Sequence, residues 1–583
     1  MSGIIPPGKP GSGKPRRLPY SVANFEQILE EDYYLVDKTA FIRELENYRV
    51  PVFLRPRRFG KTLWCSTLEC YYDIRRKEKF EELFGHLDIG RKPTDERNSY
   101  MVLRLNFSTV QVSMDMAKLE RNFASDCRIS LESFLRLHSE YFEDLVQLDP
   151  ALPAADHMKS ILTAVAEKAL PPIYLIIDEY DNFVNQLITS RREDLYEELT
   201  TGDSFFRTFF KAVKAGCESR AIGRVFITGV LPITMDDMTS GFNIAEVVSL
   251  KAPLHNMMGF TQAEVDDYLE NVLADYTLDR AMFPAIQRIM KDYYNGYRFL
   301  LDAPDTIYNS TILTYFLKHL SLDRGYPVDM IDPNVKTDVS WIERLGFGEG
   351  TPLALMQELL HSDGLAFDAR NLRDKFNMRR FFEVDHYPAS LFWLGMLTVQ
   401  SKDRLGFPNQ TLMSIFADYY SILARVEVSK GYTGYFARFR ESLDLEGLFA
   451  GYYERYLGQI PAQAFDKVNE NFVRTTFFEL CTRYLFDDFS FAIEAQHTGG
   501  RSDWEMLGRP ESPYRKKQWL LEFKYLGISS GTKPGGITEP PADAVAQLLR
   551  YKADILSTFP QYEIRCAVCV VVANIGFSWF NVA

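Results

Sequence analysis

Short apolar runs alternate with helical segments over the first half of the chain. The run Pro172–Asp178 (PIYLIID) is apolar without a break, which is typical of a central parallel strand buried on both faces. Similar runs, each followed by helical periodicity, occur at Val52–Leu54, Tyr100–Phe107 and Arg224–Thr228. Val247–Leu250 is expected to add a last strand. This alternation predicts a doubly wound α/β domain built on a parallel sheet.

From Gly259 the pattern becomes helical, and near residue 470 it returns to mixed α/β. The C-terminal order is α-β-β-β-α-β, with elements expected at Glu470–Phe486, Phe489–Gln496, Asp503–Met506, Trp519–Tyr525, Ala542–Phe559 and Glu563–Val572. We therefore expect a chain of several domains. They are a disordered basic tail (1–18), an α/β core (19–255), a helical lid (256–320), a mostly helical middle region (321–469) and a second α/β domain (470–583).

An Arg- and Pro-rich turn leads from the strand at Val52–Leu54 into a Gly-Lys-Thr sequence that opens a helix. Backbone N–H groups at such a helix start face an anion, the Lys reaches the β- and γ-phosphates, and the Thr hydroxyl can bind Mg²⁺. The usual pattern has Gly where this chain has Arg55. The alternative is a basic turn that binds nothing. The turn predicts an ATP and Mg²⁺ site formed by Arg57, Arg58, Phe59, Gly60, Lys61 and Thr62.

Acidic side chains end the longest apolar strand. Asp178 and Glu179 stand at its carboxyl end, where open α/β sheets bind ligands. Asp178 is expected to hold Mg²⁺ and Glu179 to polarise an attacking water. Thr228 ends the next strand and would lie beside the γ-phosphate, although a structural Thr in a strand-end turn is an equal alternative. These residues extend the predicted nucleotide site into a hydrolytic one.

A second group of residues falls on adjacent strands of the C-terminal domain. Alternation puts Glu522 and Lys524 on one face of their strand, where Asp503 can face them from its neighbour. Two carboxylates can hold a divalent metal, and the Lys orients water or stabilises developing charge. Glu494 and Glu479 are candidate additional ligands. The triplet is degenerate, and a surface salt bridge between Glu522 and Lys524 is the alternative.

Polar and basic residues accompany this group. Gln547 and Tyr551 share one face of the following helix and are expected to brace the site or to touch a phosphate. A basic cluster that could attract a phosphate backbone contains Arg501, Arg509, Arg515, Lys516 and Lys517. A solvated loop face explains this cluster almost as well.

Composition limits the partners. A net charge of −13 argues against a surface that clamps nucleic acid everywhere, so any such contact must be local. Seven scattered cysteines favour reduced thiols, and the pair Cys566 and Cys569 lies in an apolar run that favours strand packing over zinc binding. No apolar run approaches the ~20 residues of a membrane helix, and no secretory signal is recognisable. We expect a cytoplasmic protein with no membrane partner, with a nuclear location left open.

Several motifs resemble a known family. Tyr34–Thr39 (YLVDKT) and Leu54–Thr62 (LRPRRFGKT) resemble the predicted AAA-ATPase-like family, in which a divergent P-loop protein carries a C-terminal PD-(D/E)XK nuclease domain. The similarity continues through GFT (259–261), YNGYRF (294–299), LGMLT (394–398), PN (408–409), GRSD (500–503) and LEFK (521–524). The missing first Gly is part of this family's pattern. The resemblance implies a P-loop parallel-sheet ATPase domain, a helical lid and middle region, and a restriction-endonuclease-like α/β domain.

The resemblance also implies a chemistry. Lys61 and Thr62 would bind nucleotide phosphates and Mg²⁺, whereas Asp503, Glu522 and Lys524 would form the nuclease centre. The expected function is an ATP-dependent or ATP-gated nuclease that uses Mg²⁺, or alternatively Mn²⁺, on nucleic acid, with DNA the expected substrate. The alternatives are a nucleotide-state switch that binds nucleic acid or a protein without cleaving it, and a scaffold with a degenerate P-loop. A homo-oligomer is left open.

Overall fold

The computed structural model describes residues 15–142, 145–237, 242–327, 329–333, 355, 358–359, 364–372, 376–423, 426–427, 431–460, 468–497, 499–527 and 530–583. The chain forms two compact units. The first comprises Met1–Phe283, Tyr297–Leu317 and Ala366–Leu405. The second comprises Pro284–Gly296, Lys318–Leu365 and Gly406–Ala583.

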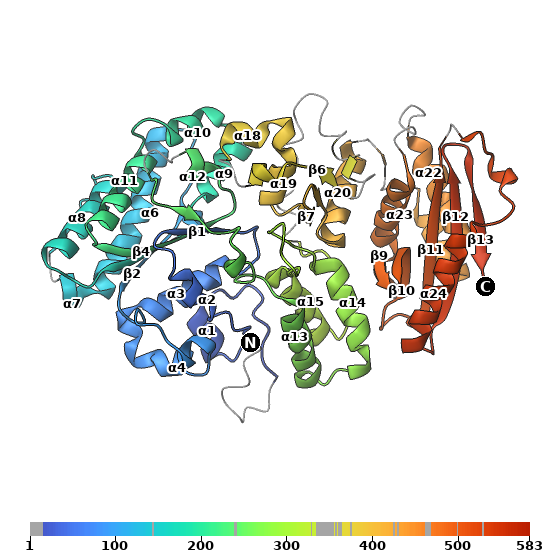
Figure 1. Cartoon of the computed structure of the whole chain (residues 1–583), viewed down its shortest axis with the longest axis horizontal. Helices are drawn as coiled ribbons and strands as arrows, with labels where there is room; N and C mark the ends of the chain where they lie inside the picture. Colours follow the sequence, from blue (N-terminus) through green and yellow to red (C-terminus); the bar gives the residue numbers. More distant parts are fainter. Residues whose placement is uncertain are drawn as a thin grey trace. The chain divides into compact units, whose positions relative to one another are not determined.

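The first unit is built on a parallel sheet with the strand order β2-β3-β4-β1-β5. Figure 1 labels β1, β2 and β4 of this sheet. Its strands are β1 (Pro51–Leu54), β2 (Met101–Asn106), β3 (Ile173–Asp178), β4 (Ile222–Gly229) and β5 (Glu246–Val247). All six residues of β3 are buried, as the unbroken apolar run predicted. The predicted parallel sheet is confirmed, although β5 is only two residues long. Because β1, β3 and β4 are neighbours, their carboxyl ends meet at one edge.

Helices surround this sheet. They are α1 (Phe25–Glu30), α2 (Phe41–Leu45), α3 (Lys61–Tyr72), α4 (Phe80–Phe84), α5 (Asp88–Arg91), α6 (Met116–Leu137), α7 (Ser139–Phe142), α8 (Ala154–Glu167), α9 (Asn182–Thr189), α10 (Glu193–Thr200), α11 (Phe205–Glu218), α12 (Ile233–Asp237), α13 (Gln262–Asp275), α18 (Met378–Phe382) and α19 (Tyr387–Trp393). α3 packs on β2 and β3, whereas α6 packs on β2 and α11 on β4. Asp115 caps α6 by accepting a hydrogen bond from the Lys118 N–H.

The structure describes the last residues of the segment that was predicted as a disordered basic tail, 1–18. Residues 1–14 lie outside the described residues, but Arg16 is buried. Its Nε lies 3.2 Å from Asp275 Oδ2, and its guanidinium lies 4.4 Å from the centroid of the Tyr34 ring. The backbone of Arg17 forms an isolated parallel β-bridge with that of Tyr33. The basic residues at the end of the predicted tail therefore belong to the fold, because an acid and an aromatic ring hold them.

The second unit contains a mixed sheet with the order β13-β12-β11-β10-β9. Its strands are β9 (Phe489–His497), β10 (Gly500–Gly508), β11 (Lys517–Leu526), β12 (Glu563–Val572) and β13 (Gly576–Val582). Only the pairing of β11 with β12 is parallel. The predicted α-β-β-β-α-β order is confirmed, with α23 (Glu470–Leu485) and α24 (Ala542–Thr558) as the helices. The sequence reasoning missed β13, which pairs with the last predicted strand.

α23 and α24 pack against the strands with separate groups of apolar side chains. Phe477 of α23 contacts the rings of Trp504 and Phe523. Leu548 of α24 belongs to a cluster with Leu520 and other residues of β11 and β12. Cys566 and Cys569 are buried free thiols in β12, as expected for strand packing. This core fixes β10 and β11, which carry the predicted metal ligands.

The predicted helical middle region is divided between the units. α20 (Gln410–Leu423), α21 (Thr433–Ser442) and α22 (Leu445–Arg455) belong to the second unit. There Phe449 of α22 contacts Phe477 and Phe523. α14 (Phe283–Tyr294) and α15 (Ser310–Leu322) each contain residues of both units. A small sheet that the sequence reasoning missed contains β6 (Leu365–Ala366), β7 (Thr398–Ser401) and β8 (Arg404–Gly406). In the described part of the chain, no helix has the length and apolarity needed to cross a bilayer.

Candidate functional site

The first candidate site is a cavity of about 520 Å³ within the first unit. The turn between β1 and α3 forms one wall, and all six residues predicted from that turn, 57–62, line the cavity. Glu179 lines it too, together with the segments 34–39 and 257–260. The cavity therefore places the Gly-Lys-Thr sequence next to an acid from the end of β3.

Arg55, which stands where the usual pattern has Gly, does not face this cavity. Its side chain is buried, and its guanidinium donates to the carbonyls of Ser249 and His255 at 2.9 and 3.3 Å. It also lies 4.5 Å and 4.1 Å from the ring centroids of Phe53 and Phe299. Burial lowers the pKa of Arg55 to about 9. Arg55 thus ties the base of the turn to the sheet, and the turn toward the cavity begins after it.

Lys61 is bound to its own turn. Its Nζ donates to the carbonyls of Arg55 and Pro56, both at 3.0 Å. Burial lowers the pKa of Lys61, and nearby carboxylates, first that of Glu179, oppose this shift. Gly60 has φ +87°, a conformation that L side chains rarely adopt. The ammonium is therefore inside the predicted phosphate cradle but is satisfied by backbone oxygens.

Residues distant in sequence hold the turn in shape. The Phe59 ring lies 5.0 Å and 5.6 Å from the rings of Tyr297 and Phe299. The Thr311 N–H donates to the Arg58 carbonyl at 3.1 Å. A Cβ at Gly395, where φ is +77°, would lie 2.4 Å from the Pro56 Cβ. Phe59 was predicted as cofactor-binding; it lines the cavity, and its side chain is buried in this packing.

The acidic end of β3 is neutralised by an arginine from β2. Arg104 Nη2 lies 3.2 Å from Asp178 Oδ2 and donates to the Thr62 carbonyl at 3.4 Å. Asp178 Oδ1 is buried and has no hydrogen-bond partner among the described residues. Burial raises the pKa of Glu179. The arrangement joins Asp178 to Thr62 and leaves one carboxylate oxygen that a hydrated cation could satisfy.

Thr228 serves the sheet rather than the cavity. Its hydroxyl is buried and donates to the Phe53 carbonyl of β1 at 2.9 Å. The structure therefore gives Thr228 the structural role that was the alternative in the sequence reasoning. A place for Thr228 beside a γ-phosphate stays a prediction.

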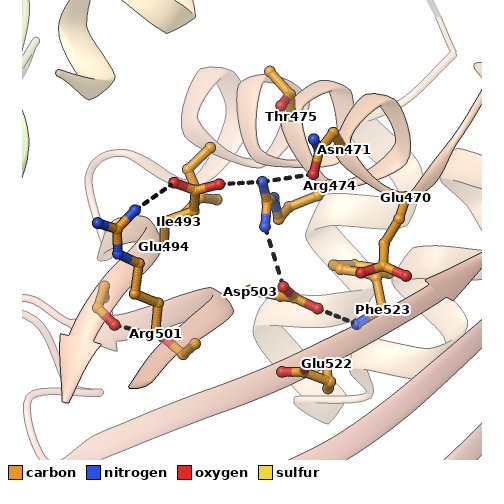
Figure 2. A network of polar contacts seen from close by, with 12 residues as sticks. Glu470, Asn471, Arg474, Thr475, Ile493, Glu494, Arg501, Asp503, Glu522 and Phe523 are labelled. Atoms are coloured by element: carbon orange, nitrogen blue, oxygen red, sulfur yellow. Dashed lines mark hydrogen bonds and ion pairs between the residues drawn. The ribbon is translucent and has the colours of Figure 1, made fainter. Parts of the chain in front are cut away.

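The second candidate site lies in the second unit, where β10 and β11 separate. The last paired residues are Trp504 and Leu521, and one further step of this register places Asp503 opposite Glu522. Instead of a ladder bond, the Asp503 carboxylate accepts a hydrogen bond from the Phe523 N–H at 2.8 Å (Figure 2). Directly opposed like charges destabilise a sheet unless something compensates them. The register thus puts Asp503 and Glu522 opposite each other, as the sequence pattern predicted, and their role as metal ligands stays a prediction.

Three further side chains surround this pair. Arg474 Nη1 of α23 donates to Asp503 Oδ1 at 3.1 Å. Lys524 Nζ lies 3.4 Å from Glu522 Oε1 and 3.5 Å from Glu470 Oε1. Lys524 therefore lies within reach of two carboxylates, and Arg474 neutralises the third.

The electrostatics of the pair favour a bound cation. Glu522 is 3% exposed, and its Oε2 has no hydrogen-bond partner among the described residues. Burial and the charge of Asp503 raise the pKa of Glu522 to about 8. Burial opposes the charge of Lys524, but Glu470, Asp503 and Glu522 outweigh it and raise the pKa of Lys524. A divalent metal would satisfy the bare oxygen and relieve the opposed charges, so the residues fit such an ion.

The fit is limited to two carboxylates. Among the described residues, no group of three or more His, Cys, Asp or Glu side chains is arranged to hold a metal ion. Asp503 and Glu522 would therefore hold a metal as a pair, with water or substrate oxygens completing the coordination.

Comparisons with known proteins match each region. Residues 19–239 match the family model described as predicted AAA-ATPase. Residues 468–578 match the model of the PD-(D/E)XK nuclease superfamily. The chain combines an AAA-ATPase-like region with a PD-(D/E)XK nuclease-like region. Both resemblances inferred from the motifs are confirmed.

No curated protein matches the chain. Among solved structures, the Walker-type ATPase PABY2304 of Pyrococcus abyssi matches with 12% identity and a TM-score of 0.38. That alignment covers 69% of this chain and 98% of the other.

Other predicted residues of the nuclease-like region have different surroundings. Glu494 contacts Arg474 and Arg501, and Glu479 pairs with Arg483. Among the described residues, no hydrogen bond or ion pair joins either carboxylate to Asp503 or Glu522. Burial raises the pKa of Glu479 to about 7. Both were predicted as extra metal ligands, and the structure pairs both with arginines.

Two further predictions have opposite outcomes. Gln547 and Tyr551 donate to the Arg501 carbonyl at 3.1 and 2.8 Å, which confirms that they brace this part of the site. Arg509 was predicted to belong to a basic cluster that could attract a phosphate backbone, but it is buried and donates to the Pro327 carbonyl at 2.8 Å. Arg515 and Lys516 of the same cluster are exposed.

The sequence reasoning missed Arg104, Glu470 and Arg474. Arg104 lies within an apolar strand, where alternation gave no reason to connect it with the next strand's Asp178. Glu470 and Arg474 are four residues apart at the start of α23 and therefore share one face. Because α23 was expected to pack on the sheet, this spacing could have indicated that Glu470 and Arg474 lie beside the predicted metal ligands.

Proposed function

We propose that the protein is an ATP-dependent or ATP-gated, metal-dependent nuclease that acts on DNA. The observation that carries this proposal is the opposed pair of Asp503 and Glu522, with a bare buried oxygen on Glu522 and Lys524 beside it. The pair lies in the region that matches the PD-(D/E)XK nuclease superfamily. A phosphate-binding turn in the AAA-ATPase-like region supports the nucleotide requirement.

At the nuclease centre, each residue has a distinct task. A metal held by Asp503 and Glu522 would neutralise phosphate charge and favour ionised water. Lys524 would orient that water and balance negative charge as it develops. Glu470 lies 3.5 Å from Lys524 and would keep the ammonium in place. Arg474 and the Phe523 N–H fix the Asp503 carboxylate from two sides.

At the nucleotide site, the turn supplies the phosphate contacts. Lys61 would exchange its two carbonyl partners for phosphate oxygens, which are stronger acceptors because they are charged. Thr62 and Asp178 would bind Mg²⁺, in keeping with the buried Asp178 oxygen that has no partner among the described residues. Glu179 borders the cavity with a raised pKa and would accept a proton from water.

The second candidate function is a nucleotide-state switch that binds nucleic acid without cleaving it. It is favoured by Arg474, which donates to Asp503 and competes with any cation for that carboxylate. In such a protein, the nuclease-like domain would bind nucleic acid but would not cleave it. Titration of Mg²⁺ or Mn²⁺ against labelled DNA separates the two functions, because the switch binds in every metal concentration and never cuts.

One preparation of the full chain tests the proposal. ATP hydrolysis and plasmid cleavage are each measured with and without the other ligand, in Mg²⁺ and in Mn²⁺. We expect Lys61→Ala to abolish ATP turnover, and Asp503→Ala to abolish cleavage while ATP turnover stays within about twofold of wild type. A matched RNA substrate checks the assignment to DNA.

The outcomes distinguish the proposals clearly. Normal cleavage by the Asp503→Ala variant would show that the site is elsewhere. Retention of DNA binding with no cleavage in either metal would favour the switch. A wild-type chain that binds no ATP would point to a scaffold with a degenerate P-loop.

A further inference from the structure

Glu494 has an unusual position for an acid beside a nuclease-like centre. The pairs Ser502–Ala495 and Trp504–Ile493 flank it, so the register of β9 and β10 brings Glu494 to the level of Asp503. Its backbone has φ +54°, a strained conformation for a residue with a side chain. Strained conformations of this kind cluster at active sites and ligand clamps.

The carboxylate of Glu494 lies between two arginines. Arg474 Nη2 donates to Oε1 at 2.6 Å, and Arg501 Nη1 lies 3.4 Å from Oε2 (Figure 2). Each carboxylate oxygen is therefore taken by a different guanidinium. Figure 2 shows Arg474 between Glu494 and Asp503, so the same arginine contacts the predicted metal ligand.

The two arginines differ in exposure in a way that suits a ligand from solvent. The Arg474 side chain is 9% exposed, and its Nε has no hydrogen-bond partner among the described residues. The Arg501 side chain is 61% exposed, and that of Glu494 is 40% exposed. The buried Arg474 and the exposed Arg501 thus contact the same carboxylate, that of Glu494, which is accessible to solvent. Guanidinium groups match phosphate oxygens as well as carboxylates.

We propose that the Glu494 carboxylate occupies the place of a backbone phosphate, and that a polynucleotide phosphate displaces it to bind Arg474 and Arg501. This inference rests on the proposed nuclease function and names how its substrate is held. The phosphate would lie next to Asp503, because Arg474 contacts both groups. Glu494 would then restrain binding rather than bind metal.

The two roles of Glu494 predict opposite results for one substitution. Glu494→Gln keeps the shape of the side chain and removes its charge. If Glu494 blocks a phosphate site, the variant binds nucleic acid more tightly, because the arginines no longer hold an anion. If Glu494 is a metal ligand, the variant loses metal binding and cleavage, with no gain in affinity for nucleic acid.

The test is fluorescence anisotropy of labelled single-stranded and double-stranded DNA in EDTA, where no cleavage occurs. We expect Glu494→Gln to lower the Kd about fivefold to tenfold. The slope of log K against log salt should steepen by up to about one unit, as for one added phosphate contact. Arg501→Gln should weaken binding severalfold, and the double variant should show no gain.

A matched control exists in the same unit. Glu563 also lies between two cations, Lys517 and Arg565, and is exposed. Glu563→Gln removes the same charge elsewhere and should leave the Kd within about twofold. An equal gain in Glu563→Gln, or no gain in Glu494→Gln, overturns the proposal.

Cleavage in Mn²⁺ is measured separately so that the two proposals fail separately. Tighter binding by Glu494→Gln with no cleavage by the wild type would support the phosphate site and contradict the nuclease function. Cleavage by the wild type together with unchanged or weaker binding by Glu494→Gln would contradict only the phosphate site. A wild-type chain that binds no DNA would overturn both.

Discussion

The two candidate sites balance charge in opposite ways. In the ATPase-like region, the key cation Lys61 is held by two backbone carbonyls, and Arg104 neutralises Asp178. In the nuclease-like region, Glu470, Asp503 and Glu522 surround Lys524, and one Glu522 oxygen has no partner in the described chain. In the first site, Lys61 is hydrogen-bonded to neutral carbonyls and could pair with an incoming anion. In the second site, acidic side chains outnumber the cations that contact them.

This difference indicates what each site needs from its ligand. An anion at Lys61 must replace hydrogen bonds that already exist, so its binding is expected to rearrange the turn. A metal between Asp503 and Glu522 would add contacts to groups that lack them, so its binding is expected to stabilise the existing arrangement. We therefore expect nucleotide binding to change the conformation of the turn, and metal binding to stabilise the nuclease-like region in its present conformation.

The largest expected effect tests whether Lys524 belongs to the chemistry. Lys524→Met removes the positive charge beside Glu470 and Glu522, and we expect cleavage to fall at least about 100-fold. ATP turnover should stay within about twofold, because the other site has its own cation. Lys517→Met on the same strand is the control, since Lys517 pairs with the exposed Glu563. Equal losses in both variants would mean that β11 is merely perturbed.

The next effect tests whether the nucleotide turn depends on its packing. Gly395→Ala adds a Cβ at 2.4 Å from Pro56 and at φ +77°, so we expect a loss of about 2 kcal/mol of stability and weaker ATP binding. Gly434→Ala is the control, because a Cβ there meets nothing within 4 Å. Thermal unfolding and nucleotide titration measure both. DNA binding by the second unit should not change.

The main strands and helices were predictable because local patterns determined them. β3 is buried throughout and reads as one apolar run, and the order of elements around β9 to β12 matched the structure. β13 was missed because its alternation is weak and it follows an apparently final strand. The β7–β8 hairpin was missed because it lies inside a region with helical character.

The sites were predictable only where the chemistry lay on consecutive strands. Asp503 and Glu522 face each other because strand register is a local consequence of the sequence pattern. Arg104, Arg474 and Glu470 were missed because their partners are 20 to 74 residues away and depend on tertiary packing. Arg55 and Arg509 were assigned to loops because the sequence does not show which arginines are buried against carbonyls.

A smaller effect tests whether a metal bound by Asp503 and Glu522 stabilises the fold. Mn²⁺ at about ten times its Kd should stabilise the wild type by ~1.4 kcal/mol against heat. Glu522→Gln should lose most of this gain, since the amide keeps the shape but not the charge. Differential scanning calorimetry of the full chain, with and without EDTA, measures both. An undiminished gain in the variant would place the metal elsewhere.

The smallest effect concerns pH in the absence of metal. The pKa of Glu522 is about 8 in the fold against an ordinary value of 4.5, so the folded chain binds this proton more tightly than the unfolded chain. The stability that protonation contributes is full below pH 4.5 and is lost as pH rises through 8. The wild type should therefore lose about 1 kcal/mol or more relative to Glu522→Gln between pH 5 and pH 8.5. Urea unfolding at both pH values, monitored in EDTA, measures the difference. If the difference in unfolding free energy between the two proteins is the same at both pH values, Glu522 is charged over the whole range. Other groups of the protein would then balance the excess of acid that distinguishes this site from the nucleotide site.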